Sequence, residues 1–212
     1  MNQTTYTSLW YKTLRLLMLG MVSTFYSFGQ VVVTNPGNTT PALAATYTSL
    51  TNAVTALNAT TNISGPVIIT LTGNETAPAG GYSITAIPAG ASAVNNITIQ
   101  GSGSIITANA ALTAGNLNDA IFKLIGADFI TIQSFTMQEN AGNTTILAAS
   151  NNMTEWGVAL LYATTTNGAQ NITIQNNTIA LNRTYQNTFG IYSNSTHTAT
   201  AVTTSATATA PT

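Results

Sequence analysis

The sequence predicts an all-β fold, a parallel β-helix (β-solenoid) with one α-helix at its N-terminal end. Three observations predict it. The phrase Ile-Thr-Ile-Gln recurs at 97–100, 130–133 and 172–175. Short apolar segments rich in β-branched residues alternate with Asn and Gly turns. After the first thirty residues, one segment has the apolar spacing of a helix.

The repeated phrase predicts the stacked strands. Its two isoleucines lie two residues apart, so they would share one face of a strand while the threonine points to the other. Such strands, recurring at intervals of tens of residues, are typical of a solenoid whose coils bury their apolar faces on one another. The first isoleucines of the three phrases are Ile97, Ile130 and Ile172. The intervals between them exceed the roughly 20 to 25 residues of a three-sided coil, so we expect one or two coils with loops between equivalent positions.

Further strands and loops follow from apolar alternation bounded by Gly, Pro and Asn. The predicted strands are 67–72, 82–87, 120–125 and 156–162, and the predicted protruding loops are 140–152 and 164–168.

The predicted helix lies near 48–58. Leu50, Ala53, Val54 and Leu57 occupy positions i, i+3, i+4 and i+7, and Thr48 or Thr46 could serve as the N-cap. The first rung of a solenoid exposes core side chains and unpaired backbone groups. We therefore predict that this helix caps the N-terminal end of the solenoid.

The N-terminus has the pattern of a signal peptide. Residues 1–15 are polar with two cations, Leu16 to Phe28 is mostly apolar, and Ser27 and Gly29 are small. This predicts a signal peptide over 1–29 with cleavage after Gly29, and hence a secreted or cell-surface protein. The apolar stretch is shorter than the roughly 20 residues that span a bilayer, so no membrane span is expected after cleavage.

The rest of the chain divides into three predicted parts. A lead-in segment occupies 30–45, the β-helix with its helix occupies 46–197, and a low-complexity tail occupies 198–212. The tail is rich in Ala and Thr and has no charged edge or helix. We interpret it as a truncated end, with a linker as the alternative.

Composition excludes several classes of function. Charged residues make up 4% of the chain against roughly 25% in average usage, while 41 threonines and 23 asparagines supply uncharged polar groups. Lys and Arg number four in all, so no surface that follows phosphates is expected and nucleic acid is not a predicted partner. The chain has no cysteine, which excludes disulfides and thiolate metal sites.

The five acids offer no recognisable catalytic motif. Enzymes that cleave polysaccharides use clustered carboxylates, or a calcium site with a basic residue. We align Asp128 with Asn96 and Asn171 at the start of the repeated phrase, so we predict a hydrogen bond from it to a corner backbone group. The others are Glu75, Asp119, Glu139 and Glu155.

Among these acids, Glu139 and Glu155 flank the 140–152 loop and are the best candidates for an acid pair or for calcium ligands. Asp119 lies in a turn, where side-chain bonding to the backbone would explain it.

Other candidate residues have structural explanations beside functional ones. His197 has no second His or Cys with which to bind a metal. Trp156 and Tyr162 could stack on sugar rings, or pack in the core beside Val158. Ranks of threonine on a solenoid face could bind ice, yet a threonine between two core isoleucines is also what an outward strand position carries.

Several segments together resemble a known family. These are the signal peptide ending Phe28-Gly29-Gln30, the helical segment Tyr47–Asn58, the strand after it, and the run Asn171–Ile179. They are similar to the N-terminal region of large secreted bacterial proteins with a right-handed parallel β-helix, the pectin-lyase-like fold. The resemblance covers most of Ala45 to Ser195. It implies the fold more strongly than the function, because the fold hosts lyases, hydrolases, adhesins and passive stalks.

The sequence therefore predicts no catalytic residue, cofactor or metal site. The leading hypothesis is a non-enzymatic structural or adhesive segment of a large exported or cell-surface protein, with polysaccharide or extracellular matrix as its partner. The alternative is a carbohydrate-active enzyme, a polysaccharide lyase or glycoside hydrolase of the same fold, with catalytic residues at the margin of this segment or outside it.

Overall fold

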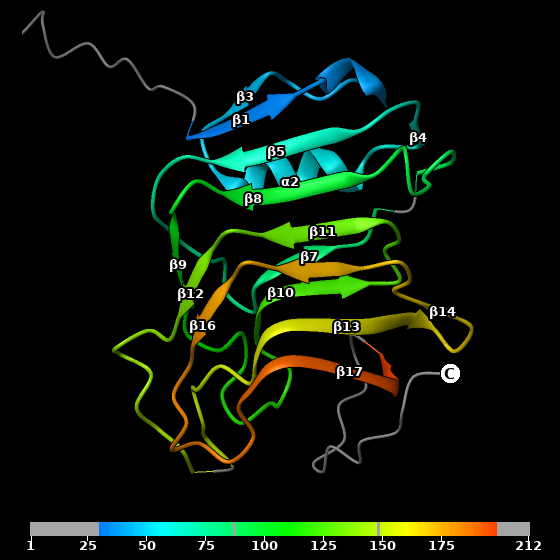
Figure 1. The fold of residues 1–212 in the computed structure, drawn as a ribbon. Coiled ribbons are helices and arrows are strands. Elements are labelled where there is room, and N and C mark those ends of the chain that lie inside the picture. The colour runs from blue at the N-terminus through cyan, green and yellow to red at the C-terminus, as the bar shows by residue number, and fades with distance from the viewer. Residues whose placement is uncertain (1–29, 87, 148, 199–212) are drawn as a thin grey trace, which may run out of the picture.

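The computed structural model describes residues 30–86, 88–147 and 149–198. The predicted signal peptide and the tail after residue 198 lie outside the described residues. The described chain is a parallel β-solenoid of about four turns, and its coils stack from top to bottom in Figure 1. The predicted all-β solenoid is thus confirmed.

Three sheets run along the solenoid, and a two-stranded ribbon joins β2 (Thr39–Thr40) to β4 (Asn62–Ile63). The first sheet has the order β15 (Thr173–Gln175), β11 (Ile130–Gln133), β8 (Ile97–Gly101), β5 (Val67–Leu71), β1 (Val31–Thr34), β3 (Thr46–Tyr47). The second has the order β16 (Thr178–Ala180), β12 (Thr136–Gln138), β9 (Ile105–Thr107), β6 (Glu75–Thr76). The third has the order β14 (Asn167–Gly168), β13 (Trp156–Thr164), β10 (Ala120–Ile125), β7 (Tyr82–Ile84), and β17 (Phe189–Thr198) pairs with β13.

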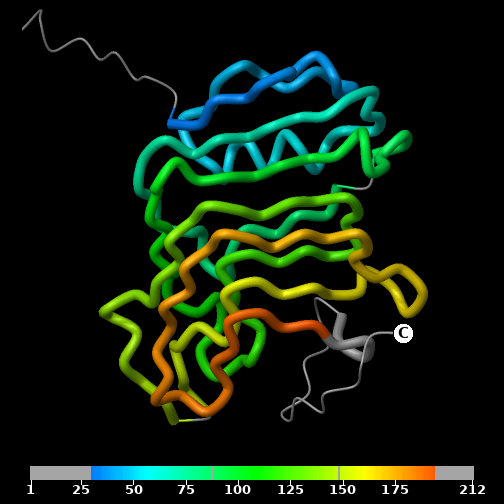
Figure 2. Tube along the Cα trace, in the orientation of Figure 1, coloured from blue at the N-terminus to red at the C-terminus, as the bar shows by residue number. Residues whose placement is uncertain are grey.

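Each coil contributes one strand to each sheet, in the chain order first, second, third (Figure 2), and the third coil adds the short β14 to the third sheet. Ile97 pairs with Val67 in the coil before and with Ile130 in the coil after, and Thr131 pairs with Thr173. The interval between successive phrases is therefore one coil, and the prediction of one or two coils resolves to one. The coils are longer than a minimal three-sided coil because long connections join the second sheet to the third.

The connections of the later coils lie together at the lower left of Figure 1. The connection between the second and third sheets spans 77–81 in the first coil, 108–119 in the second and 139–155 in the third. In the fourth coil it spans 181–188. The predicted loop at 140–152 belongs to the longest of them. The other predicted loop, 164–168, forms a hairpin between β13 and β14.

The interior is apolar and continuous along the coils. Buried residues alternate with half-buried ones in β5, β8 and β11, which places the isoleucines of the first two phrases inside and their threonines outside, as predicted. In the third phrase, Ile172 and Ile174 are half-buried and Thr173 is exposed. The Phe122 ring is fully buried, and its centroid lies 5.2 Å from that of Tyr82 and 5.4 Å from that of Phe135. Contacts of this kind couple one coil to the next.

The predicted helix is α2 (Leu50–Asn58), and Leu50, Ala53, Val54 and Leu57 are its buried residues, as expected. Its N-cap is Ser49, whose side chain accepts a hydrogen bond from the Asn52 backbone N–H, and not Thr48 or Thr46. Ser49 takes this position because it is the residue with extended backbone directly before the first helical residue.

Both ends of α2 bond to the first coil. At the N-terminus, the Leu50 N–H donates to Glu75 Oε2 at 2.9 Å, while the Tyr82 hydroxyl donates to Glu75 Oε1 at 2.9 Å. At the C-terminus, Asn58 Nδ2 donates to the Ser83 carbonyl at 2.8 Å, and Asn58 Oδ1 accepts from the Thr85 N–H at 2.9 Å. A carboxylate at a helix N-terminus is favourable to the helix dipole.

The lead-in segment is structured. Strand β1 pairs antiparallel with β5 and with β3, so it extends the first sheet beyond the first coil. The 3-10 helix η1 (Pro36–Asn38) follows it. Within the described residues, no helix is long and apolar enough to cross a membrane.

Candidate functional site

Asp119 and Glu155 lie side by side in neighbouring coils, each directly before a strand of the third sheet. The pairing of Ala120 with Trp156 sets their register. The Asp119 N–H donates to Glu155 Oε2 at 2.9 Å, and the Glu155 N–H donates to the Asp119 carbonyl at 3.1 Å. Asp119 is 4% exposed and Glu155 1% exposed, so this pair is closed to solvent.

Two segments of the stacked connections hold the pair in place. The Leu112 N–H donates to Asp119 Oδ1 at 3.1 Å. The Gly115 N–H donates to the Asn151 carbonyl at 2.9 Å, and Asn151 Nδ2 donates to the Asn116 carbonyl at 3.4 Å. The 112–119 and 149–155 segments therefore lie against each other beside the carboxylates.

Four buried side-chain oxygens in this region accept no hydrogen bond: Asn118 Oδ1, Asp119 Oδ2, Asn151 Oδ1 and Glu155 Oε1. Buried acceptors are ordinarily paired, because an unpaired one loses its hydration without compensation. We call Asn118, Asp119, Asn151 and Glu155 the oxygen cluster. The unpaired oxygens are thus concentrated in two facing segments of the chain.

Burial governs the protonation of this region. Burial raises the pKa of Glu155 to about 8, and the negative charge of Asp119 adds to the rise. Burial also raises the pKa of Asp119, which the Leu112 N–H and the positive charge of Lys123 oppose. Burial lowers the pKa of Lys123, while the two carboxylates oppose that change.

Tyr185 completes the surroundings. Its hydroxyl lies beside the Glu155 carboxylate, and burial raises the pKa of Tyr185 to about 12. The structure thus brings together two acids, a lysine and a tyrosine from three successive coils.

The pair that the sequence suggested is not the pair that forms. Glu139 has its own partners: Oε1 accepts from the Asn140 N–H, Asn143 Nδ2 and Thr154 Oγ1, and Oε2 accepts from the Thr154 N–H. Glu155 instead faces Asp119, the acid assigned to a turn. Asp119 and Glu155 meet because the strands β10 and β13 pair in a register that places Ala120 opposite Trp156. The distance between the two acids along the sequence does not indicate this pairing.

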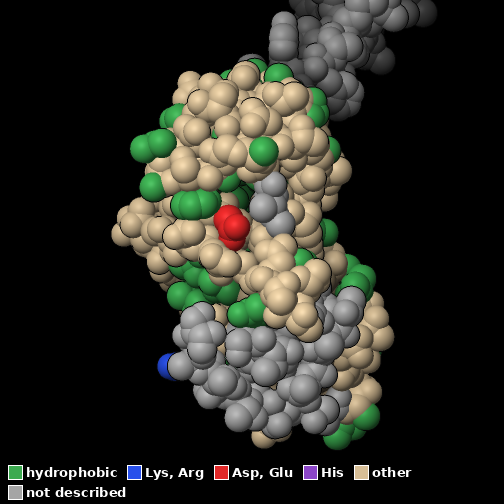
Figure 3. Space-filling model, turned by 90° about the vertical axis from the view of Figure 1, so that its right-hand side faces the viewer, with side chains coloured by type: hydrophobic (Ala, Val, Ile, Leu, Met, Phe, Trp, Pro, Cys, Tyr) green, Lys and Arg blue, Asp and Glu red, His purple; other side chains and the backbone are tan. Residues whose placement is uncertain are grey.

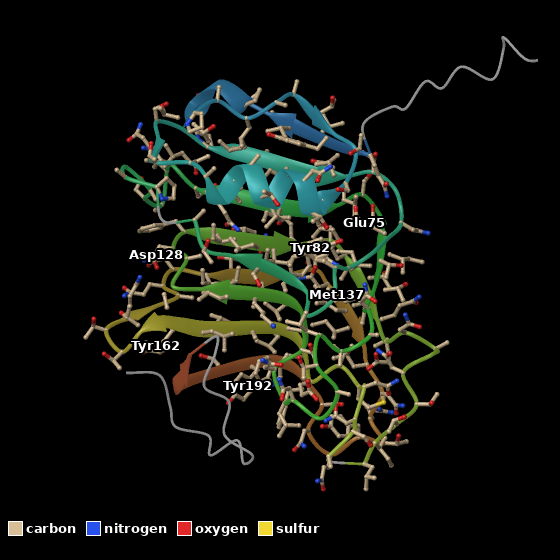
Figure 4. All side chains as sticks on the ribbon, turned by 180° about the vertical axis from the view of Figure 1, so that it is seen from behind. Glu75, Tyr82, Asp128, Met137, Tyr162 and Tyr192 are labelled. Atoms are coloured by element: carbon tan, nitrogen blue, oxygen red, sulfur yellow. The ribbon has the colours of Figure 1, made fainter. Side chains whose placement is uncertain are left out.

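Asp128 and Glu75 lie on opposite sides of the molecule (Figure 4). Asp128 Oδ1 accepts from the Gln170 N–H at 2.8 Å, which confirms the predicted corner hydrogen bond. The alignment behind that prediction was wrong, because Asp128 pairs with Gln170. Ile130 pairs with Ile97, so Phe129 is the residue that corresponds to Asn96.

Trp156 does not offer a platform for sugars. It is 3% exposed, and its ring stacks on Tyr192 with centroids 4.5 Å apart, so the core interpretation holds. Tyr162 is half-buried on β13, beside the β14 hairpin. The position of His197 falls within β17, but its side chain lies outside the part of the chain that is described.

A groove of about 340 Å³ runs along the N-terminal ends of the first-sheet strands. Phe129 borders it with a half-buried ring and a left-handed backbone, φ 56°. Asn171, in the following coil, has the same backbone with φ 55°. Asn adopts this conformation readily whereas a bulky aromatic residue is an outlier there. The other lining residues are Ala93, Asn96, Thr131, Ile172 and Thr173.

Next to the groove, polar side chains form two columns across the coils of the first sheet. Thr98, Thr131 and Thr173 are in register. In the second column, Gln100 Nε2 donates to Thr70 Oγ1, Gln133 Nε2 to Gln100 Oε1, and Gln175 Nε2 to Gln133 Oε1, at 3.1, 2.8 and 2.7 Å. The glutamines interrupt the broad threonine array that ice binding needs.

Charge is scarce on the described part of the face shown in Figure 3, where acidic atoms occupy one small area among hydrophobic side chains, uncharged polar groups and backbone. Among the described residues, no group of three or more His, Cys, Asp or Glu side chains could hold a metal ion. The oxygen cluster falls outside that description, because half of its members are asparagines.

Comparison with protein-family models, with curated proteins and with solved structures found no match to this chain. Its function must therefore be argued from its own geometry.

Proposed function

We propose that the chain is a non-enzymatic structural or adhesive segment of a large exported or cell-surface protein, and that its first sheet contacts glycans. In this proposal the coils form a right-handed, pectin-lyase-like β-helix, and α2 caps its N-terminal end. The bonds of Asn58 to the backbone of β7 and the residue after it support the cap, because a terminal strand otherwise presents unpaired groups.

The observation that carries the glycan assignment is Phe129. A bulky residue held in the left-handed region is strained, and such strain is characteristic of binding and catalytic positions. The ring borders a groove whose amides and hydroxyls come from Asn96, Thr131, Asn171 and Thr173. An apolar ring surrounded by a few polar groups suits a sugar, which has an apolar face and a rim of hydroxyls.

A glycan array probed with the full chain, followed by calorimetry on the best ligand, tests this assignment. Phe129→Ala should weaken binding about tenfold or more, equivalent to about 1.4 kcal/mol. Phe129→Asn is the matched variant, because Asn already occupies this backbone conformation at position 171. It should fold normally and bind as weakly as the alanine variant. Unchanged binding by both variants would remove the groove from the proposal.

The export assignment has a separate test. The pattern over residues 1–29 supports a cleaved signal peptide. Expression in a secreting bacterial host, with mass spectrometry of the protein outside the cytoplasm, should give a chain that begins at Gln30. Recovery of the uncleaved chain from the cytoplasm alone would contradict it.

The second candidate, a carbohydrate-active enzyme, is favoured by one observation. Asp119, Glu155 and Lys123 are near one another with shifted pKa values, as catalytic groups often are. Against it, Lys123 is only 7% exposed and both acids less, whereas a glycosidase needs its carboxylates on an open face. Release of reducing ends or unsaturated products from a panel of polysaccharides, abolished by Glu155→Gln, would favour the enzyme over the adhesive segment.

A further inference from the structure

The oxygen cluster is the strongest unexplained feature of the described chain. Each of its members has one buried oxygen that accepts no well-formed hydrogen bond, although the Tyr185 hydroxyl lies near the Glu155 carboxylate. Asp119, Asn151 and Glu155 are at least nine-tenths buried. Elsewhere in the same connections, carboxylate oxygens are fully engaged, as the four bonds to Glu139 show. The unpaired oxygens are therefore a local feature of this cluster.

The chemistry of these oxygens selects the missing partner. All four are carboxylate or amide carbonyl oxygens, which are the ligands that hard cations take. Calcium accepts about 6 to 8 such ligands in irregular arrangements. Magnesium demands a regular octahedron and gives up its waters reluctantly, and zinc prefers nitrogen and sulfur.

Charge points the same way. Asp119, Glu155 and Lys123 are buried near one another, so ionisation of both acids would leave one negative charge unbalanced in a region closed to solvent. Burying a net negative charge is costly unless a cation balances it.

We propose that Asn118, Asp119, Asn151 and Glu155 form a structural calcium site that ties the 112–119 connection to the 149–155 connection. The site joins two coils at the start of the third sheet, where Ala120 pairs with Trp156. Its burial makes it a structural site and not a catalytic one, and it is independent of the glycan assignment.

Three other partners would satisfy some of the same oxygens. The Tyr185 hydroxyl could donate to Glu155, a proton on Glu155 could be shared with Asp119, or a buried water could bridge the amides. None of these would respond to calcium, so calcium dependence distinguishes the proposal from all three.

The test is thermal unfolding of the full chain after treatment with EDTA, with and without added CaCl2, together with calorimetric titration of calcium. At a calcium concentration of about 100 times Kd, we expect a rise in Tm of about 5 to 10 °C and one calcium bound per chain. Magnesium at the same concentration should raise Tm less. Equal Tm values with and without calcium, and no binding heat, would overturn the proposal.

Variants locate the effect. Glu155→Gln should abolish the calcium-dependent rise in Tm, whereas Asp128→Asn, which changes a corner acid outside the cluster, should keep it. If Glu155→Gln does not fold, Asn118→Asp tests the site by adding a carboxylate to it. This variant should bind calcium at least tenfold more tightly than the parent chain, and in EDTA it should unfold at a lower temperature than the parent chain. A calcium response that survives Glu155→Gln, or that Asn118→Asp leaves unchanged, would place calcium elsewhere.

Discussion

Replacing Asn58 by alanine should lower the free energy of unfolding by about 1 to 2 kcal/mol. The change removes two hydrogen bonds, to the Ser83 carbonyl and from the Thr85 N–H, each worth about 0.5 to 1.5 kcal/mol net. Alanine is the better helix former by up to about 0.7 kcal/mol, which offsets part of the loss. Water can reach the freed groups because the Asn58 side chain is half-buried, so no full desolvation cost is added.

Urea unfolding followed by far-UV circular dichroism measures this loss, with Asn52→Ala as the control. Asn52 lies on the same helix, and its side chain donates one exposed hydrogen bond to Thr48 Oγ1. The control should therefore stay within about 0.5 kcal/mol of the parent chain. Amide hydrogen exchange gives a local readout, because the Thr85 N–H should exchange faster in Asn58→Ala alone. Equal stability of the two variants, with unchanged exchange at Thr85, would refute the role of Asn58 at the edge of β7.

Three further sets of substitutions test the coil contacts. Phe122→Ala should cost about 3 to 5 kcal/mol in urea unfolding, because the ring is fully buried and packs on two other rings; a loss below about 1 kcal/mol would contradict that packing. Gly81→Ala should prevent stable folding by circular dichroism, since an added Cβ would meet the Ala120 carbonyl and φ is +91°. Gly103→Ala, with φ +75° and open space, should cost only about 1 to 2 kcal/mol. Gln133→Ala, which removes two amide bonds of the column, should cost about 1 kcal/mol, more than Gln138→Ala with its single bond.

The strands of the first sheet could be predicted because their signal is local. An alternation of buried and outward side chains repeats in three phrases, and the same alternation fixes the register, since a slip by one residue would turn the isoleucines outward. The helix was equally accessible from its apolar spacing. Its cap was misassigned among several neighbouring hydroxyl residues, where the backbone conformation of Ser49 makes the choice.

The coil length and the oxygen cluster could not be predicted in the same way. A connection adds residues without changing the strands that it joins, so the interval from Ile130 to Ile172 fits one coil or two until the pairing is known. The pairing of Asp119 with Glu155 also depends on the coil length, because the residues between them form one whole coil. The two amides gave no signal at all in a chain with 23 asparagines.

The glycan groove and the calcium site should be separable by mutation, because different strand ends build them. The groove lies where the chain begins β8, β11 and β15, whereas the cluster lies where it begins β10 and β13. Within a coil, one strand of the first sheet and one strand of the second sheet separate the two positions. These strands pair without a register shift with those of the neighbouring coil. Phe129→Asn should therefore weaken glycan binding and leave the calcium-dependent rise in Tm unchanged. Glu155→Gln should abolish the calcium-dependent rise in Tm and leave glycan binding unchanged, measured at a temperature where both variants are folded. Loss of both properties in either variant would mean that the two sites are coupled through the solenoid and do not act independently.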